Sequence, residues 1–178
     1  MFVLIFLIIA SSITSISDIW QFFLQIFYMR LSNSIFEKCK GKMDTETINF
    51  FMNKKNKIGF IGATIQKEKW GYKKYKELKD AGFKVYPVNP KYAEVDGDRC
   101  FSNLKSLIDF LHEKPDFVIT IIPPKVTEKT VEQCKILGID KIWMQPGSES
   151  EKAIEFCKEN GIEVVHGICI VVDALQKL

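Results

Sequence analysis

The chain has 178 residues and a formal net charge of +3, and apolar residues make up 47% of it, including 14 phenylalanines. This composition is typical of a domain with a packed core, and the small charge, with lysines scattered among acidic residues, argues against a nucleic-acid binder. The five cysteines are widely spaced and form no C-x-x-C pair, which favours reduced thiols in a cytosolic domain over a disulfide framework.

Residues 1–42 form an apolar N-terminal extension. The first 17 residues carry no charge. A segment of this length is about the minimum that can span a membrane. No basic residue precedes this run and no small-x-small site follows it, so a secretory signal peptide is disfavoured. If the segment inserts, Arg30 and the lysines that follow it would keep the rest in the cytoplasm. Two explanations stay open: a membrane anchor, or sequence upstream of a true start at Met43.

Residues 43–178 are predicted to form the folded domain. After a short lead-in helix that follows Met43, five runs rich in Val and Ile predict strands buried on both faces of a parallel sheet. These runs are residues 57–62, 83–88, 116–122, 140–145 and 162–166.

Helical patterns separate the predicted strands. They are residues 71–81, 103–111, 126–137 and 149–160. Ser102 is expected to cap the second helix, and Ser148 or Ser150 the fourth. The alternation predicts an α/β fold, a doubly wound, mainly parallel, five-stranded Rossmann-like sheet.

The first strand runs into a loop that is typical of phosphate binding. Gly62 and Ala63 let a diphosphate approach the backbone, Thr64 offers a hydroxyl, and the helix that starts near Gly71 offers free N–H groups. Lys67 and Lys69 add positive potential. The glycines at 59, 62 and 71 do not fit G-x-G-x-x-G, which points away from nicotinamide dinucleotides. A tight turn without a ligand is the alternative.

The later strand ends are expected to reach the same edge of the sheet. Asn89-Pro90-Lys91 lacks the acid that binds the ribose of NAD, and Lys91 favours a phosphorylated ribose, which both coenzyme A and NADP carry. In the segment Pro123-Pro124-Lys125, the two prolines offer an apolar wall for an adenine ring. Gln145-Pro146-Gly147 offers an amide and a close backbone. Each of these segments also fits a plain turn. No catalytic machinery is recognisable among them.

His166 and Cys169 follow the fifth strand. Two side chains do not make a zinc site, and a nucleophilic pair needs an orienting group and an oxyanion site that the sequence does not supply. Structural roles are therefore favoured, and neither a metal site nor a catalytic residue is assigned.

The strand-end segments together resemble the small stand-alone CoA-binding domain family. Its fold is that of the CoA-binding domain of the succinyl-CoA synthetase alpha subunit and of ADP-forming acyl-CoA synthetases. The segments that carry the resemblance are Ile61-Gly62-Ala63-Thr64, Gly71-Tyr72, Pro87-Val88-Asn89-Pro90-Lys91, Pro123-Pro124-Lys125-Val126, Trp143-Met144-Gln145-Pro146-Gly147-Ser148-Glu149-Ser150 and His166-Gly167-Ile168-Cys169. They lie within about residues 45–172 and exclude the apolar extension.

The resemblance implies that the domain binds coenzyme A or an acyl-CoA through its ADP moiety, without catalysis of its own. The loop after the first strand would cradle the diphosphate, while Asn89-Pro90-Lys91 and Pro123-Pro124-Lys125 would line the adenosine 3′-phosphate end. Two other functions stay open, an NADP-dependent Rossmann oxidoreductase and a membrane-tethered interaction protein. A homodimer and an acyl-CoA enzyme as partner are both compatible with the sequence, and a membrane is a partner only if residues 1–42 are genuine.

Overall fold

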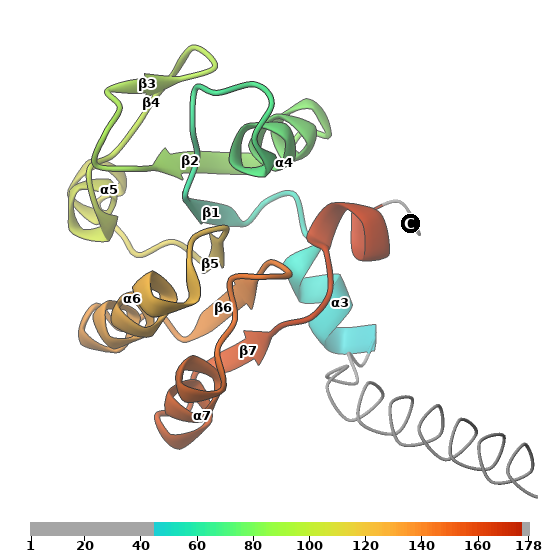
Figure 1. The fold of residues 1–178 in the computed structure, drawn as a ribbon, viewed down its shortest axis with the longest axis vertical. Helices are drawn as coiled ribbons and strands as arrows, with labels where there is room; N and C mark the ends of the chain where they lie inside the picture. Colours follow the sequence, from blue (N-terminus) through green and yellow to red (C-terminus); the bar gives the residue numbers. More distant parts are fainter. Residues whose placement is uncertain (1–44, 176–178) are drawn as a thin grey trace, which may run out of the picture. The chain divides into compact units, whose positions relative to one another are not determined.

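The computed structural model describes residues 45–175, and residues 1–44 and 176–178 lie outside this range. Its centre is a five-stranded sheet in the order β2-β1-β5-β6-β7 (Figure 1), in which every pair of neighbours is parallel. The strands are β1 (Lys57–Ile61), β2 (Lys84–Val88), β5 (Phe117–Thr120), β6 (Lys141–Met144) and β7 (Glu163–Val165). The predicted parallel Rossmann-like sheet is confirmed, with each strand one to three residues shorter than expected.

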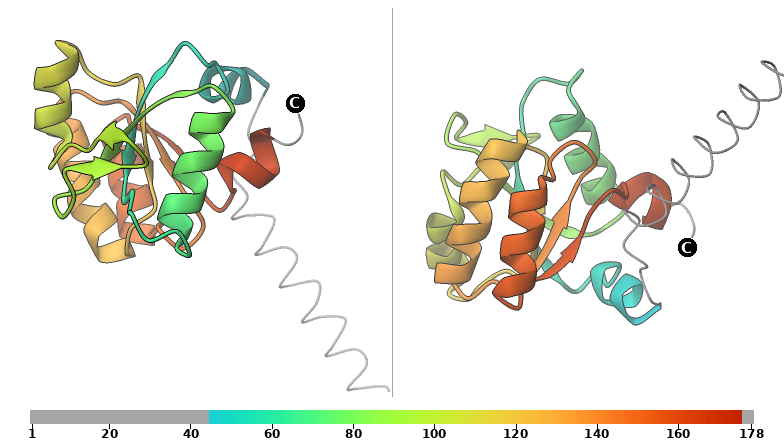
Figure 2. Two further views of the ribbon diagram at one scale, coloured as in Figure 1. Left: turned by 90° about the horizontal axis from the view of Figure 1, so that it is seen from above. Right: turned by 60° about the horizontal axis from the view of Figure 1, so that its bottom comes forward.

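Helices cover both faces of the sheet, so the doubly wound architecture is confirmed. One face carries α5, α6 and α7, and the other carries α3, α4 and the short π-helix η2 (Figures 1 and 2). Their bounds are α3 (Thr45–Phe51), α4 (Trp70–Asp80), α5 (Leu104–Leu111), α6 (Pro124–Ile136), α7 (Glu151–Glu159) and η2 (Ile170–Ala174).

The central strand β5 shows why the sequence reads as continuously apolar. All four of its residues are buried, and successive side chains enter opposite layers. Phe117 packs in the layer of α3 and α4, whereas Val118 packs in the layer of α6 and α7. Phe51 of the lead-in helix α3 places its ring centroid 4.7 Å from that of Phe117 and 5.3 Å from that of Trp143. The lead-in helix is therefore part of the core.

Two helix caps are resolved by the structure. Asn103, not Ser102, caps α5: its Oδ1 accepts a hydrogen bond from Ser106 N at 2.9 Å, and Ser106 Oγ accepts one from Asn103 N at 3.3 Å. Ser150 caps α7 by accepting a hydrogen bond from Ala153 N at 3.1 Å. The expected cap at Ser102 is wrong because a capping box needs a partner three residues on, and Asn103 has it in Ser106.

A small hairpin between β2 and α5 was not predicted. It pairs β3 (Glu94–Val95) with β4 (Asp98–Arg99) in antiparallel fashion. The turn residues Asp96 and Gly97 both have positive φ, as a two-residue hairpin turn requires. The Asp-Gly dipeptide is the signal that marks this hairpin in the sequence.

The expected extension at residues 1–42 lies outside the described residues. Within residues 45–175, no helix combines the length and the apolar character that crossing a membrane requires.

Candidate functional site

A groove of about 1040 Å³ lies at the carboxyl ends of the strands. Its walls include Gly62 after β1 and Ile122 after β5. These two strands are neighbours in the sheet although the chain visits β2 between them. They therefore define the switch point at which open α/β sheets bind ligands.

The floor of the groove is formed by backbone packed against backbone. Gly62 has φ +99°, and a Cβ at this position would lie 2.4 Å from the carbonyl oxygen of Ile121. A Cβ on Gly71, at the start of α4, would lie 2.3 Å from the carbonyl oxygen of Gly62. No side chain fits at either contact. The two glycines thus bring the first loop, the N-terminus of α4 and the end of β5 together.

The N-terminus of α4 opens into the groove. Lys69, Trp70 and Gly71 all line it, and no side chain of the described residues caps this helix. The first-turn N–H groups of a helix have no partner within the helix, and they carry partial positive charge. Lys69 adds a full positive charge beside them. This end of the groove is therefore suited to an anion.

Asn89 joins the first two strand-end loops. Its Nδ2 donates a hydrogen bond to the carbonyl oxygen of Ala63 at 2.7 Å, and its Oδ1 accepts one from Lys91 N at 3.0 Å. Thr64 Oγ1 donates to the hydroxyl of Tyr92 at 3.2 Å across the same gap. Both ends of the Asn89 amide are thus engaged within the protein, which makes this residue a holder of the loops that line the groove.

Ser148 joins the loops that follow β5 and β6. Its Oγ accepts a hydrogen bond from Ile122 N and donates one to Ile122 O, both at 2.7 Å. Pro123 and Pro124 then start α6, in the position where proline needs no N–H partner. Of the two residues expected as alternative caps of α7, Ser150 is the cap, and Ser148 forms this link instead.

The structure brings most of the predicted site residues together. Ten line the groove: Gly62, Thr64, Lys69, Gly71, Asn89, Pro90, Lys91, Pro123, Pro146 and Gly147.

The other five predicted residues do not line it: Ala63, Lys67, Pro124, Lys125 and Gln145. Ala63 is buried and contributes its carbonyl to Asn89. Lys125 is 88% exposed and pairs with Glu128 at 3.5 Å. Gln145 is buried, and its Nε2 has no partner among the described residues.

One wall of the groove was missed by the sequence reading. Val126, Lys129, Thr130 and Gln133 of α6 all face it. Their spacing of three and four residues places them on one side of a helix. The signal was present as a helical face, but only the position of α6 next to β5 shows that this face meets the groove. Tyr92 was also missed.

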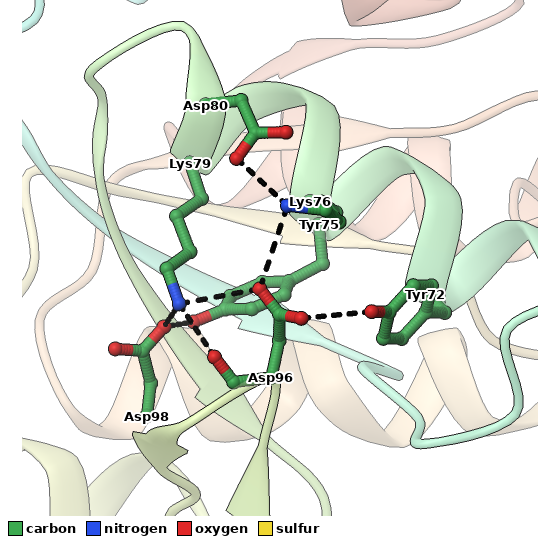
Figure 3. Close-up of polar contacts among 7 residues, drawn as sticks. All are labelled: Tyr72, Tyr75, Lys76, Lys79, Asp80, Asp96 and Asp98. Atoms are coloured by element: carbon green, nitrogen blue, oxygen red, sulfur yellow. Dashed lines mark hydrogen bonds and ion pairs between the residues drawn. The ribbon is translucent and has the colours of Figure 1, made fainter.

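A polar network fastens the hairpin to α4 (Figure 3). Tyr72 donates a hydrogen bond to Asp96 at 2.7 Å, and Tyr75 donates one to Asp98 at 2.6 Å. Lys79 Nζ lies 3.3 Å from Asp96 Oδ2 and 2.5 Å from Asp98 Oδ2. The network holds the segment that begins with the groove residues Lys91 and Tyr92.

The same network shifts the pKa values of two of its residues. The hydrogen bond from Tyr72, followed by that from Lys79, holds the pKa of Asp96 below its ordinary value of 3.8. Burial is the main cause that raises the pKa of Tyr75, and its hydrogen bond to Asp98 adds to the effect. Asp96 is therefore a carboxylate whose ionised form is favoured by folding.

This lowered pKa predicts a pH dependence of stability. The contribution of Asp96 is complete above its unfolded pKa near 3.8 and is lost as the pH falls through the lower pKa of the folded state. The urea midpoint of the wild-type chain is expected to fall below about pH 4, and that of Asp96→Asn to fall less steeply. Asp109→Asn, which removes an exposed carboxylate paired with Lys105 on α5, serves as control. Equal slopes for wild type and Asp96→Asn would contradict this role.

His166 and Cys169 lie apart from the groove lining. Burial lowers the pKa of His166, against a smaller opposing effect of Glu149. Cys169 N donates a hydrogen bond to Asp173 at 2.9 Å. Residues 45–175 contain no group of three or more His, Cys, Asp or Glu side chains placed to hold a metal ion. Structural roles for the pair stay a prediction.

Comparison with known proteins shows similarity to ADP-forming acetate–CoA ligases of archaea. The chain is 37% identical over 82 residues to the enzyme of Methanocaldococcus jannaschii, a match that covers 46% of this chain and 11% of the ligase. It is 27% identical over 134 residues to the alpha subunit of ligase II of Pyrococcus furiosus, covering 69% of this chain and 28% of the subunit. The chain therefore spans only a small part of these relatives.

Small proteins match over nearly their whole length. The chain is 35% identical to a conserved hypothetical protein of Pyrococcus furiosus of known structure, with a TM-score of 0.62, covering 66% of this chain and 97% of that one. A hypothetical protein of Pyrococcus horikoshii is 29% identical with a TM-score of 0.66, covering 76% and 92%. Residues 56–174 match the family model described as CoA binding domain. The chain belongs to this CoA-binding domain family.

Proposed function

We propose that this chain binds coenzyme A or an acyl-CoA through the ADP moiety, in the groove at the carboxyl ends of the strands. The observation that carries the proposal is the contact between Gly62 and Gly71, which exposes loop backbone and the first turn of α4 to the groove of a domain from the CoA-binding family. A diphosphate is the part of coenzyme A that such a loop and helix start would bind.

The groove also supports binding of the adenosine end. Lys69 and Lys91 both line it, Lys69 in the loop between β1 and α4 and Lys91 in the loop that follows β2. Pro123 and Val126 offer an apolar wall for the ring. The volume of about 1040 Å³ lies at the upper end of the usual range for ligand pockets.

Binding without turnover is the second part of the proposal. Among the described residues that line the groove, Glu68 is the single carboxylate, and no histidine or cysteine occurs. General acid–base catalysis uses such groups most often. We therefore assign no catalytic residue and propose a binding module. We also propose that this module is located in the cytoplasm.

An acyl-CoA enzyme is the partner that we propose for this module. Proteins named as acetate–CoA ligases contain a similar segment as 11% and 28% of their length. A homodimer is the alternative. Sedimentation of the chain with and without such an enzyme distinguishes a complex with the enzyme from a homodimer.

Calorimetric titration of the full chain with coenzyme A, acetyl-CoA and NADP tests the function. We expect coenzyme A and acetyl-CoA to bind with micromolar Kd and NADP to give no heat. Lys69→Met should weaken coenzyme A about fivefold, a loss of about 1 kcal/mol. Lys55→Met, a change at an exposed lysine before β1 at the opposite edge of the sheet, should leave the affinity unchanged. Binding of NADP without coenzyme A would overturn the proposal, and binding of neither would favour an interaction protein.

A further inference from the structure

A second pocket of about 390 Å³ opens beside the groove. It shares Pro90, Lys91, Tyr92 and Ser102 with the groove lining, so the two cavities adjoin. Beyond these shared residues it is lined by Arg99 of β4 and Ser106 of α5. The sequence reading assigned no role to Arg99.

Arg99 is held by two aromatic rings. Its guanidinium carbon lies 5.3 Å from the ring centroid of Phe101 and 5.3 Å from that of Phe110. Contacts of this kind attract a cation to the ring face, and they restrict where the guanidinium can go. The side chain is thus placed in advance at the wall of the pocket.

The charge of Arg99 is not neutralised within the described part of the chain. No ion pair joins it to a carboxylate of residues 45–175, although Glu94 is its register partner across the hairpin. Lys91, on the shared wall, is exposed and likewise forms no ion pair with another residue of 45–175. Two cations therefore border one small pocket, together with the hydroxyls of Ser102 and Ser106.

We infer that this second pocket binds the phosphate on the ribose of the ligand, and that Arg99 is the residue that selects ligands carrying it. A guanidinium presents several N–H donors in a planar fork that matches phosphate oxygens. The inference deepens the proposed function and rests on it. The loop after β1 would take the diphosphate, and the pocket under the hairpin would take the 3′-phosphate of coenzyme A.

Paired titrations with coenzyme A and dephospho-CoA, which lacks only the 3′-phosphate, test this assignment in the full chain. We expect the wild type to bind coenzyme A about tenfold more tightly than dephospho-CoA. Arg99→Met should weaken coenzyme A to about the level of dephospho-CoA while leaving dephospho-CoA unchanged. Arg99→Lys should give an intermediate loss, because it keeps the charge and loses the fork. Lys55→Met controls for loss of a distant positive charge.

The outcomes separate the two proposals. Equal affinities of the wild type for the two ligands overturn the phosphate pocket and leave the proposed function standing. Equal weakening of both ligands by Arg99→Met and Arg99→Lys also overturns it, because Arg99 would then only support the fold. If neither coenzyme A nor dephospho-CoA binds to the wild type, the proposed function and the phosphate pocket are both overturned. A wild-type preference that is lost in Arg99→Met, reduced in Arg99→Lys and kept in Lys55→Met supports the assignment.

Discussion

Gly62→Ala is expected to lower the free energy of unfolding by about 3 kcal/mol. Two costs add. The residue has φ +99°, a conformation that costs a residue with a Cβ about 1–2 kcal/mol. The new Cβ would also lie 2.4 Å from Ile121 O and 2.8 Å from a side-chain carbon of Ile122. The first of these is backbone at the end of a central strand, so it cannot move away without disturbing the sheet.

Gly82→Ala is the matched control for this prediction. Gly82 has a similar φ of +84°, but apart from its chain neighbours no heavy atom of residues 45–175 lies within 4 Å of the position of its Cβ. Gly82→Ala should therefore lower the free energy of unfolding by about 1–2 kcal/mol. Urea denaturation followed by the fluorescence of the buried Trp143 measures both variants. Equal losses would show that the close approach to Ile121 carries no cost.

The same contact limits what Gly62 variants reveal about ligand binding. A side chain at this position meets the protein's own backbone first. Loss of coenzyme A affinity in a Gly62 variant would therefore combine damage to the loop with any block of the ligand. Lys69 and Arg99 are better probes, because lysine and arginine side chains at the surface can be shortened without strain.

Ser148→Ala is expected to lower the free energy of unfolding by about 2 kcal/mol. Ser148 is 2% exposed, and its hydroxyl forms hydrogen bonds to both the N–H and the carbonyl of Ile122 at 2.7 Å. Removing the hydroxyl leaves both backbone groups of Ile122 without this partner. Because Pro123 and Gly147 line the groove on either side of the link, we also expect weaker binding of coenzyme A.

Ser102→Ala is the control for Ser148. Ser102 is exposed, and its hydroxyl lies 3.5 Å from that of Ser106. Ser102→Ala should change the free energy of unfolding by less than about 0.5 kcal/mol. A Ser148→Ala variant as stable as Ser102→Ala would mean that water replaces the buried hydroxyl at no cost.

Strands and helices could be read from the sequence because their signals are local. Val118 and its neighbours form an apolar run of the kind expected for a strand buried on both faces. Gly82, Gly138 and Gly161 follow α4, α6 and α7 with positive φ, and a glycine in this conformation is a common local signal for the end of a helix. The cap of α5 was assigned one residue too early, since Ser102 and Asn103 are both good caps and only the bond to Ser106 decides between them.

The candidate site was predicted less completely, because it depends on contacts between distant segments. Lys125 belongs to the same strand-end segment as Pro123, yet it points to solvent, since positions two residues apart at the start of a helix project to nearly opposite sides. Asn89 lines the groove, and its amide also joins two loops, a second role that the sequence did not indicate. The groove face of α6 and the hairpin that carries Arg99 were both missed.

The sequence by itself determined the parallel α/β fold, the chain positions of the turns and the membership of the CoA-binding family. These follow from apolar runs, from glycines and prolines, and from ordered motifs, all of which act over a few residues. Only the tertiary structure decided that Gly62 must be small because Ile121 lies against it, and that Arg99 meets Lys91 at one pocket. Such contacts depend on the strand order β2-β1-β5 and on how the hairpin packs on α4, and packing between distant segments leaves no periodic trace in the chain.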